Sequence, residues 1–126
     1  PLYRATDNRT GVARSFNNIG AVYSSLGEQQ KALEYYQQAL PLFRTLKNRN
    51  GEATTLNNIG LQYSYLGENR KALEYYQQAL PLLRTLGNKT VEAATLNNIG
   101  GVYSDLGEKQ KALEYYQQAL PLFRTL

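Results

Sequence analysis

Apolar residues recur along the chain at spacings of three and four, which places them on one face of an α-helix. A first apolar stripe contains Val12, Phe16, Ile19, Gly20, Tyr23 and Leu26. A second, after Gly27, contains Ala32, Leu33, Tyr36, Ala39, Leu40, Phe43 and Leu46. The pattern predicts two helices that pack through these stripes. Gly20 lies inside the first stripe, where its missing side chain allows the partner helix to approach closely.

The same two-helix pattern occurs three times with a period of 40 residues, since Asn17, Asn57 and Asn97 begin equivalent segments. The run KALEYYQQALPL is identical in all three copies. A unit this regular buries its apolar face by stacking on its neighbours. The sequence therefore predicts an all-α solenoid of antiparallel helix pairs, with repeats at 9–48, 49–88 and 89–126. Residues 1–8 are expected to be the tail and loop of a preceding repeat, because PLYRAT matches PLFRTL at the end of a unit.

The ends of the helices are marked by residues that favour caps and turns. Asparagine is a good N-cap, and glycine suits the left-handed turn that ends a helix. First helices are expected at Arg9–Ser25, Arg49–Tyr65 and Lys89–Asp105, capped by Asn8, Asn48 and Asn88 and ended by Gly27, Gly67 and Gly107. Second helices are expected from Glu28, Glu68 and Glu108 to Leu46, Leu86 and Leu126.

A proline occurs inside each predicted second helix, at Pro41, Pro81 and Pro121. Proline removes one helical hydrogen bond and usually breaks or kinks a helix. On a helical wheel, however, Pro41 lies about 160° from the buried face, so the freed carbonyl can reach water. We predict a kinked but continuous helix. The competing interpretation is a true break at Leu40, because residues before proline avoid the helical region.

These positions resemble the tetratricopeptide repeat family. The resemblance rests on Phe16, Ile19, Gly20, Tyr23, Gly27, Ala32, Tyr36 and Ala39, repeated 40 and 80 residues later with Leu in place of Phe16. It implies a right-handed superhelix whose first helices line a concave groove. The common repeat has about 34 residues, so the 40-residue unit is similar to the longer repeats of kinesin light chains, spindle-orientation adaptors and bacterial arrays.

Two adjacent asparagines stand opposite the packing stripe of each first helix. With Phe16 set at zero on the wheel, the first asparagine lies at about 100° and the second at about 200°. They are Asn17 and Asn18, Asn57 and Asn58, and Asn97 and Asn98. An amide both donates and accepts, so a ladder of amides suits the backbone of an extended peptide. Two alternatives stay open: the Asn18 set could bond to the adjacent repeat, and the Asn17 set could be merely solvated.

The resemblance assigns contact with peptide main chain or a C-terminal carboxylate to the second asparagine of each pair. Differences between copies also occur on the side of the first helices opposite the packing stripe. There Leu61, Tyr65 and Asp105 replace their counterparts in the other units. Arg14 is expected to supply positive charge at one end of the groove, and Asp105 negative charge at the other. Tyr65 is the one tyrosine expected to anchor a ligand; the others are expected to pack.

Composition narrows the classes of function. The chain has no cysteine and no histidine, which removes thiolate nucleophiles, imidazole bases and most zinc sites. Its serines have no base beside them. We therefore predict no enzyme activity and no cofactor. The net charge of +4 is scattered, so neither nucleic acid nor membrane is an expected partner. No apolar run reaches the ~20 residues that cross a membrane, and a cytoplasmic location is the default.

The sequence then predicts a non-catalytic scaffold that binds an extended peptide or protein segment in the groove. An alternative is a self-associating scaffold that forms homo-oligomers by end-to-end stacking, because the terminal units expose apolar surface. The resemblance to bacterial arrays further implies a sensor segment whose effector domain lies outside this chain. The start at Pro1 rather than at a methionine also indicates a piece of a longer protein.

Overall fold

Six α-helices account for nearly all of the described chain. The computed structural model describes residues 2–126, and the side chains of residues 8–126. The helices are α1 (Leu2–Ser25), α2 (Gln29–Thr45), α3 (Arg49–Tyr65), α4 (Asn69–Leu86), α5 (Lys89–Asp105) and α6 (Lys109–Arg124). No strand occurs among these residues. The predicted all-α class is confirmed.

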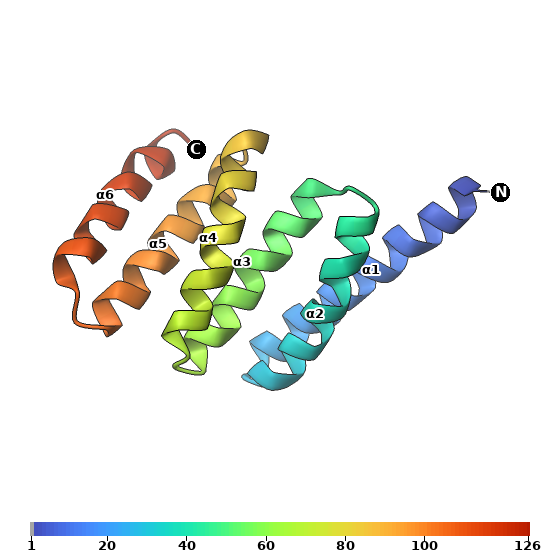
Figure 1. Cartoon of the computed structure of the whole chain (residues 1–126), viewed down its shortest axis with the longest axis horizontal. Coiled ribbons are helices and arrows are strands. Elements are labelled where there is room, and N and C mark those ends of the chain that lie inside the picture. Colours follow the sequence, from blue (N-terminus) through green and yellow to red (C-terminus); the bar gives the residue numbers. More distant parts are fainter. Residues whose placement is uncertain (1) are drawn as a thin grey trace.

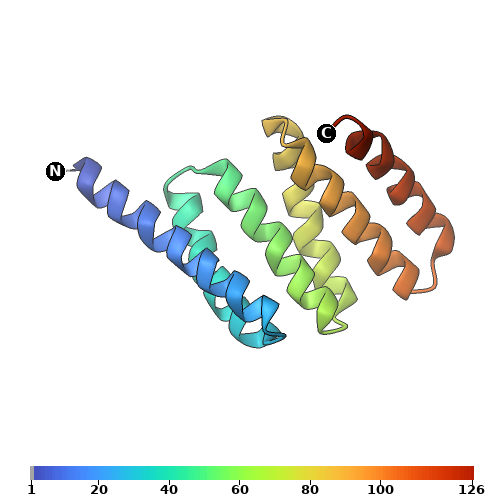
Figure 2. The same cartoon turned by 180° about the vertical axis from the view of Figure 1, so that it is seen from behind.

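Consecutive helices form hairpins, and the hairpins stack in a row. Helices α1 and α2, α3 and α4, and α5 and α6 are the paired helices, while α2 packs on α3 and α4 packs on α5. Figure 2 shows α1, α3 and α5 side by side on one face of the row. Figure 1 shows α2 and α4 on the opposite face, with α6 at the end of the row. The chain is therefore an all-α solenoid, and we call the surface of α1, α3 and α5 the first-helix face.

Two of the three predicted asparagine caps are present. The side chains of Asn48 and Asn88 accept hydrogen bonds from the backbone N–H groups of Gly51 and Val91, at 2.9 and 3.2 Å. The expected cap at Asn8 is wrong, and so is the expected loop before it, because α1 runs unbroken from Leu2. A left-handed residue precedes each cap that forms, Lys47 before Asn48 and Gly87 before Asn88. The backbone before Asn8 is helical instead.

The close approach predicted at the glycine of the first stripe is confirmed in every hairpin. A Cβ atom built on Gly20 would lie 2.7 Å from the Cε1 atom of Tyr36. Gly60 meets Tyr76 and Gly100 meets Tyr116 at the same distance. The tyrosine ring therefore occupies the space that any larger residue at the glycine position would need. This contact fixes the separation of the two helices within each hairpin.

The second helices are continuous through their prolines. Helix α2 runs to Thr45 with Pro41 inside it, and α4 and α6 contain Pro81 and Pro121 in the same way. The alternative of a break at Leu40 is wrong. Pro41 is exposed, so its position on the solvent side agrees with the wheel.

The predicted apolar stripes are buried in the middle of the row and less so at its edges. Ile59 and Ile99 are fully buried, whereas Ile19 on α1 is 39% exposed because no hairpin packs beyond α1. Val12 is exposed for the same reason. The stripe also extends less far than expected, since Leu26 and its equivalents lie exposed at the turns between the helices.

Within the part of the chain that the structure describes, no helix combines the length and the apolar character that a membrane span requires. No group of three or more acidic, histidine or cysteine side chains in the described part could hold a metal ion.

Candidate functional site

The first asparagine of each pair joins neighbouring first helices. The Thr55 hydroxyl donates to Asn17 Oδ1 at 3.4 Å, and the Thr95 hydroxyl lies 2.8 Å from both Asn57 Oδ1 and the Val91 carbonyl, two acceptors that share its single proton. The contacts with Asn17 and Asn57 link residues 38 positions apart. Thr95 and Asn57 are both buried, at 0% and 8% exposed. A buried polar group requires such a partner, because losing water without replacing its hydrogen bond is costly.

The alternative that the Asn17 set is merely solvated is wrong for Asn17 and Asn57, whereas the alternative that the Asn18 set bonds to the adjacent repeat holds for Asn98, which donates to Asn57 Oδ1 at 3.5 Å. The Asn17 set, expected to be a rail of the groove or merely solvated, makes contacts between units at Asn17 and Asn57. Asn97 has no α-helix of a further unit beside it and is exposed. Burial of Asn57 corrects the expectation that it presents a free amide to a ligand.

The second asparagine of each pair is more accessible. Asn18 is exposed, and Asn58 and Asn98 are half-buried. Asn98 donates a long hydrogen bond, at 3.5 Å, to Asn57 Oδ1. Among the residues with described side chains, the Asn18 and Asn58 amides make no side-chain hydrogen bond that would occupy them. This set retains donors and acceptors on the first-helix face.

A second polar contact crosses between α1 and α3 and is missing between α3 and α5. Gln62 Nε2 donates to Ser24 Oγ at 2.9 Å, and Gln62 is 1% exposed. Its counterpart on α5 is Val102, which cannot make this bond to Ser64. The hydroxyl of Ser64 is thus left facing the space between α3 and α5.

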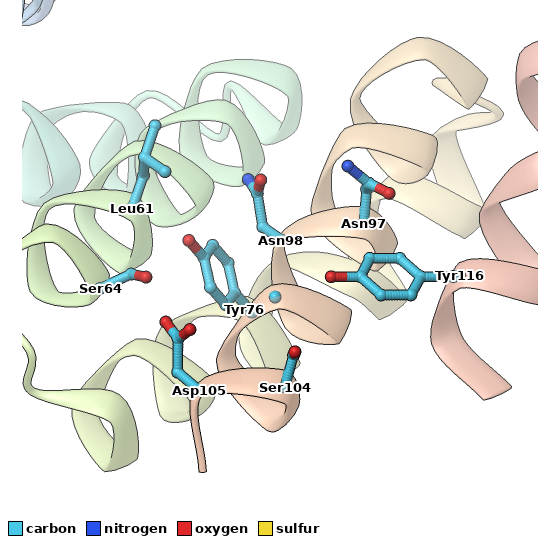
Figure 3. Close-up of a pocket in the computed structure, with 9 residues that line it drawn as sticks. Leu61, Ser64, Tyr76, Asn97, Asn98, Ser104, Asp105 and Tyr116 are labelled. Carbon is cyan, nitrogen blue, oxygen red and sulfur yellow. The ribbon is translucent and has the colours of Figure 1, made fainter. Parts of the chain in front are cut away.

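A pocket of about 290 Å³ opens in that space. Figure 3 shows side chains from α3 and α5 around it, with Tyr76 of α4 in the middle of the view and Tyr116 of α6 at the right, beside Asn97. Its lining consists of Leu61, Ser64, Tyr76, Asn97, Asn98, Gly101, Ser104, Asp105 and Tyr116. The volume is at the lower end of the range for binding pockets, about 300–1,000 Å³.

Tyr76 contributes an unsatisfied hydroxyl to the pocket. The residue is 0% exposed, and its oxygen has no hydrogen-bond partner among the described residues. In Figure 3 the hydroxyl points toward the space between Leu61 and Asn98. Burial raises the pKa of Tyr76, and the negative charge that Tyr65 would carry raises it further. The phenol therefore stays protonated and can both donate and accept.

The pocket brings together four of the predicted site residues, namely Leu61, Asn97, Asn98 and Asp105. The others do not line it: Asn58, Arg14 and Tyr65 lie elsewhere on the first helices, and Tyr65 is 59% exposed.

The sequence did not indicate the part played by Tyr76, Tyr116, Ser64 and Ser104. The expectation that no histidine or lysine stands beside the serines is wrong for Ser104, whose hydroxyl accepts from Lys109 Nζ at 2.8 Å. The tyrosines were expected to pack, and they do, but the hydroxyl of Tyr76 reaches the pocket. The sequence feature that could have indicated the pocket is the change from Leu61 to Gly101 at equivalent positions, because it removes a side chain from the first-helix face.

Several solved structures share the fold. The tetratricopeptide repeat domain of Arabidopsis FLU matches with a TM-score of 0.88 and 21% identity, over 94% of this chain and 99% of that one. BtubC from P. vanneervenii matches with a TM-score of 0.82 and 26% identity, over 90% of this chain and 47% of that one. The TPR2AB domain of yeast Sti1, solved as a complex with pHSP90, matches with a TM-score of 0.78 and 25% identity. That match covers 91% of this chain and 42% of the Sti1 chain.

The chain thus spans under half the length of two of these proteins. A search of the curated proteins found no match. The sequence profile of the tetratricopeptide repeat matches residues 1–45 and 48–125. Together with the stacked hairpins and the glycine–tyrosine contacts, this match shows that the chain belongs to the tetratricopeptide repeat family.

Proposed function

We propose that the chain is a non-catalytic scaffold whose first-helix face binds an extended peptide or protein segment. The observation that carries the proposal is the set of amides at Asn18, Asn58 and Asn98. They recur every 40 residues on one face. Asn17 and Asn57 of the neighbouring set make contacts between units, and among the described residues Asn98 alone of these three amides takes part in such a contact.

The donors and acceptors of these amides suit a backbone ligand. Each amide can donate to a carbonyl and accept from an N–H group, as a strand-like peptide requires. The fold also supports the proposal, since the Sti1 domain of the same architecture was solved with a bound pHSP90 partner. Catalysis is not part of the proposal, because the family generally serves as an interaction scaffold and the chain contains no histidine or cysteine.

The proposal is tested by selecting binders from a random peptide library against the whole chain and measuring their affinity by calorimetry. Asn58→Ala should weaken the selected peptides about five- to tenfold, because one hydrogen bond contributes about 1 kcal/mol. Gln30→Ala is the matched control, since it removes an exposed amide from α2 on the opposite face. Equal affinity for wild type and Asn58→Ala across all selected peptides would contradict the proposal.

As a second function, we propose head-to-tail association of the chain with a second copy. The observation that favours it is the exposed face of α6. Leu33, Tyr36, Leu40 and Phe43 of α2 are at most 7% exposed, because α3 covers them. The equivalent residues of α6 are Leu113, Tyr116, Leu120 and Phe123, and they are 36–49% exposed.

Side-chain size matches this face to α1 of a second copy. At the junction of α2 and α3, Gly51 faces the ring of Phe43, and a Cβ there would lie 2.6 Å from Phe43 Cε1. At the next junction the corresponding pair is Leu83 and Val91. Leu83 is smaller than Phe43, and Val91 is correspondingly larger than Gly51. By this rule Phe123 of α6 requires a glycine opposite it.

Gly11 of a second copy supplies that glycine, because it occupies the position equivalent to Gly51. Nothing lies within 4 Å of a Cβ built on Gly11, so its surface is open. Val12 stands where Glu52 and Glu92 pair with Arg44 and Arg84 inside the chain. The contact between copies lacks that ion pair and is expected to be weaker than the internal junctions.

Sedimentation of the whole chain tests this association. We expect dimers or longer stacks at concentrations up to about 1 mM. Gly11→Val should weaken the association at least tenfold by colliding with Phe123, and adding Phe123→Leu should restore it, since Leu and Val are the pair at the internal junction. A monomer at every concentration, or equal association of wild type and Gly11→Val, would refute the contact.

A further inference from the structure

The pocket between α3 and α5 exists where the three units differ in sequence. Gly101 stands at the position of Ala21 and Leu61, and Asp105 stands at the position of Ser25 and Tyr65. At the preceding junction the side chain of Leu61 would occupy the space that Gly101 leaves open. The pocket is therefore a feature of one junction rather than of the repeat, which suits a site for one particular group.

Ser104 and Asn98 in the lining have partners in the protein, Lys109 and Asn57, but two hydroxyl groups of the pocket do not. The Tyr76 hydroxyl is fully buried and has no partner within the described chain, and Ser64 lacks the amide that Gln62 offers to Ser24. An unpaired buried hydroxyl is a cost to the folded state. A ligand group that forms a hydrogen bond with it would remove this cost on binding.

Charge decides which kind of group fits. Asp105 is the only charged residue among those that line the pocket, and it forms no ion pair with any described residue. The ammonium of Lys109 lies at the edge of the pocket, where it donates to the Oγ of the lining residue Ser104 at 2.8 Å and to the Ser104 carbonyl at 3.1 Å, and it forms no ion pair with Asp105. An anion would be repelled by Asp105, whereas a cation would be attracted to it.

We propose that this pocket binds the cationic side chain of an arginine or lysine carried by a segment on the first-helix face. The inference rests on the proposed function, because it assumes that such a segment is the ligand. The aliphatic stem would pack on Leu61 and the tyrosine rings. The charged head would donate to Asp105, to the Ser64 hydroxyl and to the Tyr76 oxygen, and hydrogen bonds to a carboxylate from a cation are the stronger kind.

The first test is an NMR titration of the whole ¹⁵N-labelled chain with N-acetyl-arginine N-methylamide. We expect saturable shifts of the backbone amides of Gly101 and Asp105. N-acetyl-citrulline N-methylamide has nearly the same shape without the charge, and it should bind at least fivefold more weakly. The corresponding glutamate compound should produce no saturable shift.

Three variants separate the pocket from a general surface effect. Asp105→Asn should abolish the preference for arginine over citrulline. Gly101→Leu should abolish binding by filling the space, and the fold tolerates it because a Cβ at Gly101 meets only the Tyr116 oxygen, at 3.8 Å. Ala21→Leu makes the same change on α1, and binding should be unaffected.

Tyr76→Phe gives a further readout that a purely structural role would not produce. It should weaken arginine binding while leaving the chain as stable as wild type or more stable, since the lost hydroxyl had no partner.

The inference is overturned if arginine and citrulline bind equally, if the shifts fail to saturate at the pocket, or if Asp105→Asn leaves the preference intact. These results are distinct from failure of the proposed function. Selected peptides that bind through Asn58 without any preference for arginine would contradict the proposed cation site and leave the proposed function standing. Arginine binding without any selected peptide would support the pocket and contradict the extended-segment proposal.

Discussion

At the scale of single residues, the two adjacent asparagines have different surroundings. Asn57 is buried and accepts from Thr95 on the next first helix, whereas Asn58 is half-buried on the first-helix face. The helix turns by about 100° per residue, so neighbours in sequence face different environments. One asparagine therefore holds the units together, and its neighbour keeps an amide available.

Removing the buried Thr95 hydroxyl tests the contact between units. Thr95→Val should lower the free energy of unfolding by about 1–3 kcal/mol, because Asn57 Oδ1 then keeps only the long bond from Asn98. Ser15→Ala is the matched control at the equivalent position of α1, where Ser15 is exposed, and its effect should be within about 0.5 kcal/mol. Urea denaturation measures both. Equal losses in the two variants would contradict the assigned contact.

The buried phenol predicts how stability depends on pH. Burial raises the pKa of Tyr76 above its ordinary value of about 10. The folded state thus holds this proton more tightly than the unfolded state, so its contribution is complete below pH 10 and is lost as the pH rises above it. Tyr76→Phe should make the alkaline fall of the unfolding free energy shallower. Burial also raises the pKa of Tyr36, so part of the alkaline decrease in the unfolding free energy remains in the Tyr76→Phe variant. Identical slopes above pH 10 would refute the prediction.

At the scale of helices, pairs of large and small residues set how closely the elements pack. Gly60 receives the ring of Tyr76 within a hairpin, and Gly51 receives the ring of Phe43 between hairpins. Protein interiors are close-packed, so one added methyl group at such a position forces neighbouring atoms to move. Each junction therefore tolerates a change only if both of its residues change together.

A double-mutant cycle at the junction of α2 and α3 tests this coupling. Gly51→Val alone should destabilise the chain by about 1–3 kcal/mol through overlap with Phe43. Phe43→Leu alone leaves a cavity and should also destabilise. The double variant should be more stable than the sum of the two losses predicts, because Leu83 and Val91 form that pair at the next junction. Additive losses would show that the two positions do not interact.

The helices and their contacts within a hairpin could be predicted from sequence because both depend on local order. The 3.6-residue period identified the stripes, and the glycines at 20, 60 and 100 identified the close approach. The asparagine contact could not be predicted from one helix alone. Asn17 and Ser15 lie on opposite flanks of the wheel, at about 100° and 260°, and the equivalent flanks meet only when helices stand side by side.

The pocket and the start of α1 also depend on more than local sequence. The pocket is lined by Gly101 and Asp105, which differ from their counterparts in the other units, and by a tyrosine expected only to pack. Asn8 has the residue type of a cap, but no left-handed turn precedes it, and α1 continues through it. An N-cap residue begins a helix only where the preceding chain leaves the helical conformation.

At the scale of the whole molecule, stacking produces two surfaces with different properties. The first-helix face holds the Asn18 set and the pocket, while the face of α6 exposes large apolar side chains. In a solenoid each unit contacts only its neighbours, so stability is spread along the row. The first-helix face is formed only by several units together. The proposed binding of an extended segment therefore depends on the array rather than on one residue.

Binding on the first-helix face is tested by the NMR signals of the side-chain amides when a selected peptide saturates the chain. We expect large shifts for Asn58 and Asn98 on the first-helix face, and unchanged signals for Gln30 and Gln110 on the second helices. Shifts confined to Gln30 and Gln110, with Asn58 and Asn98 unmoved, would place the ligand on the opposite face and contradict the account.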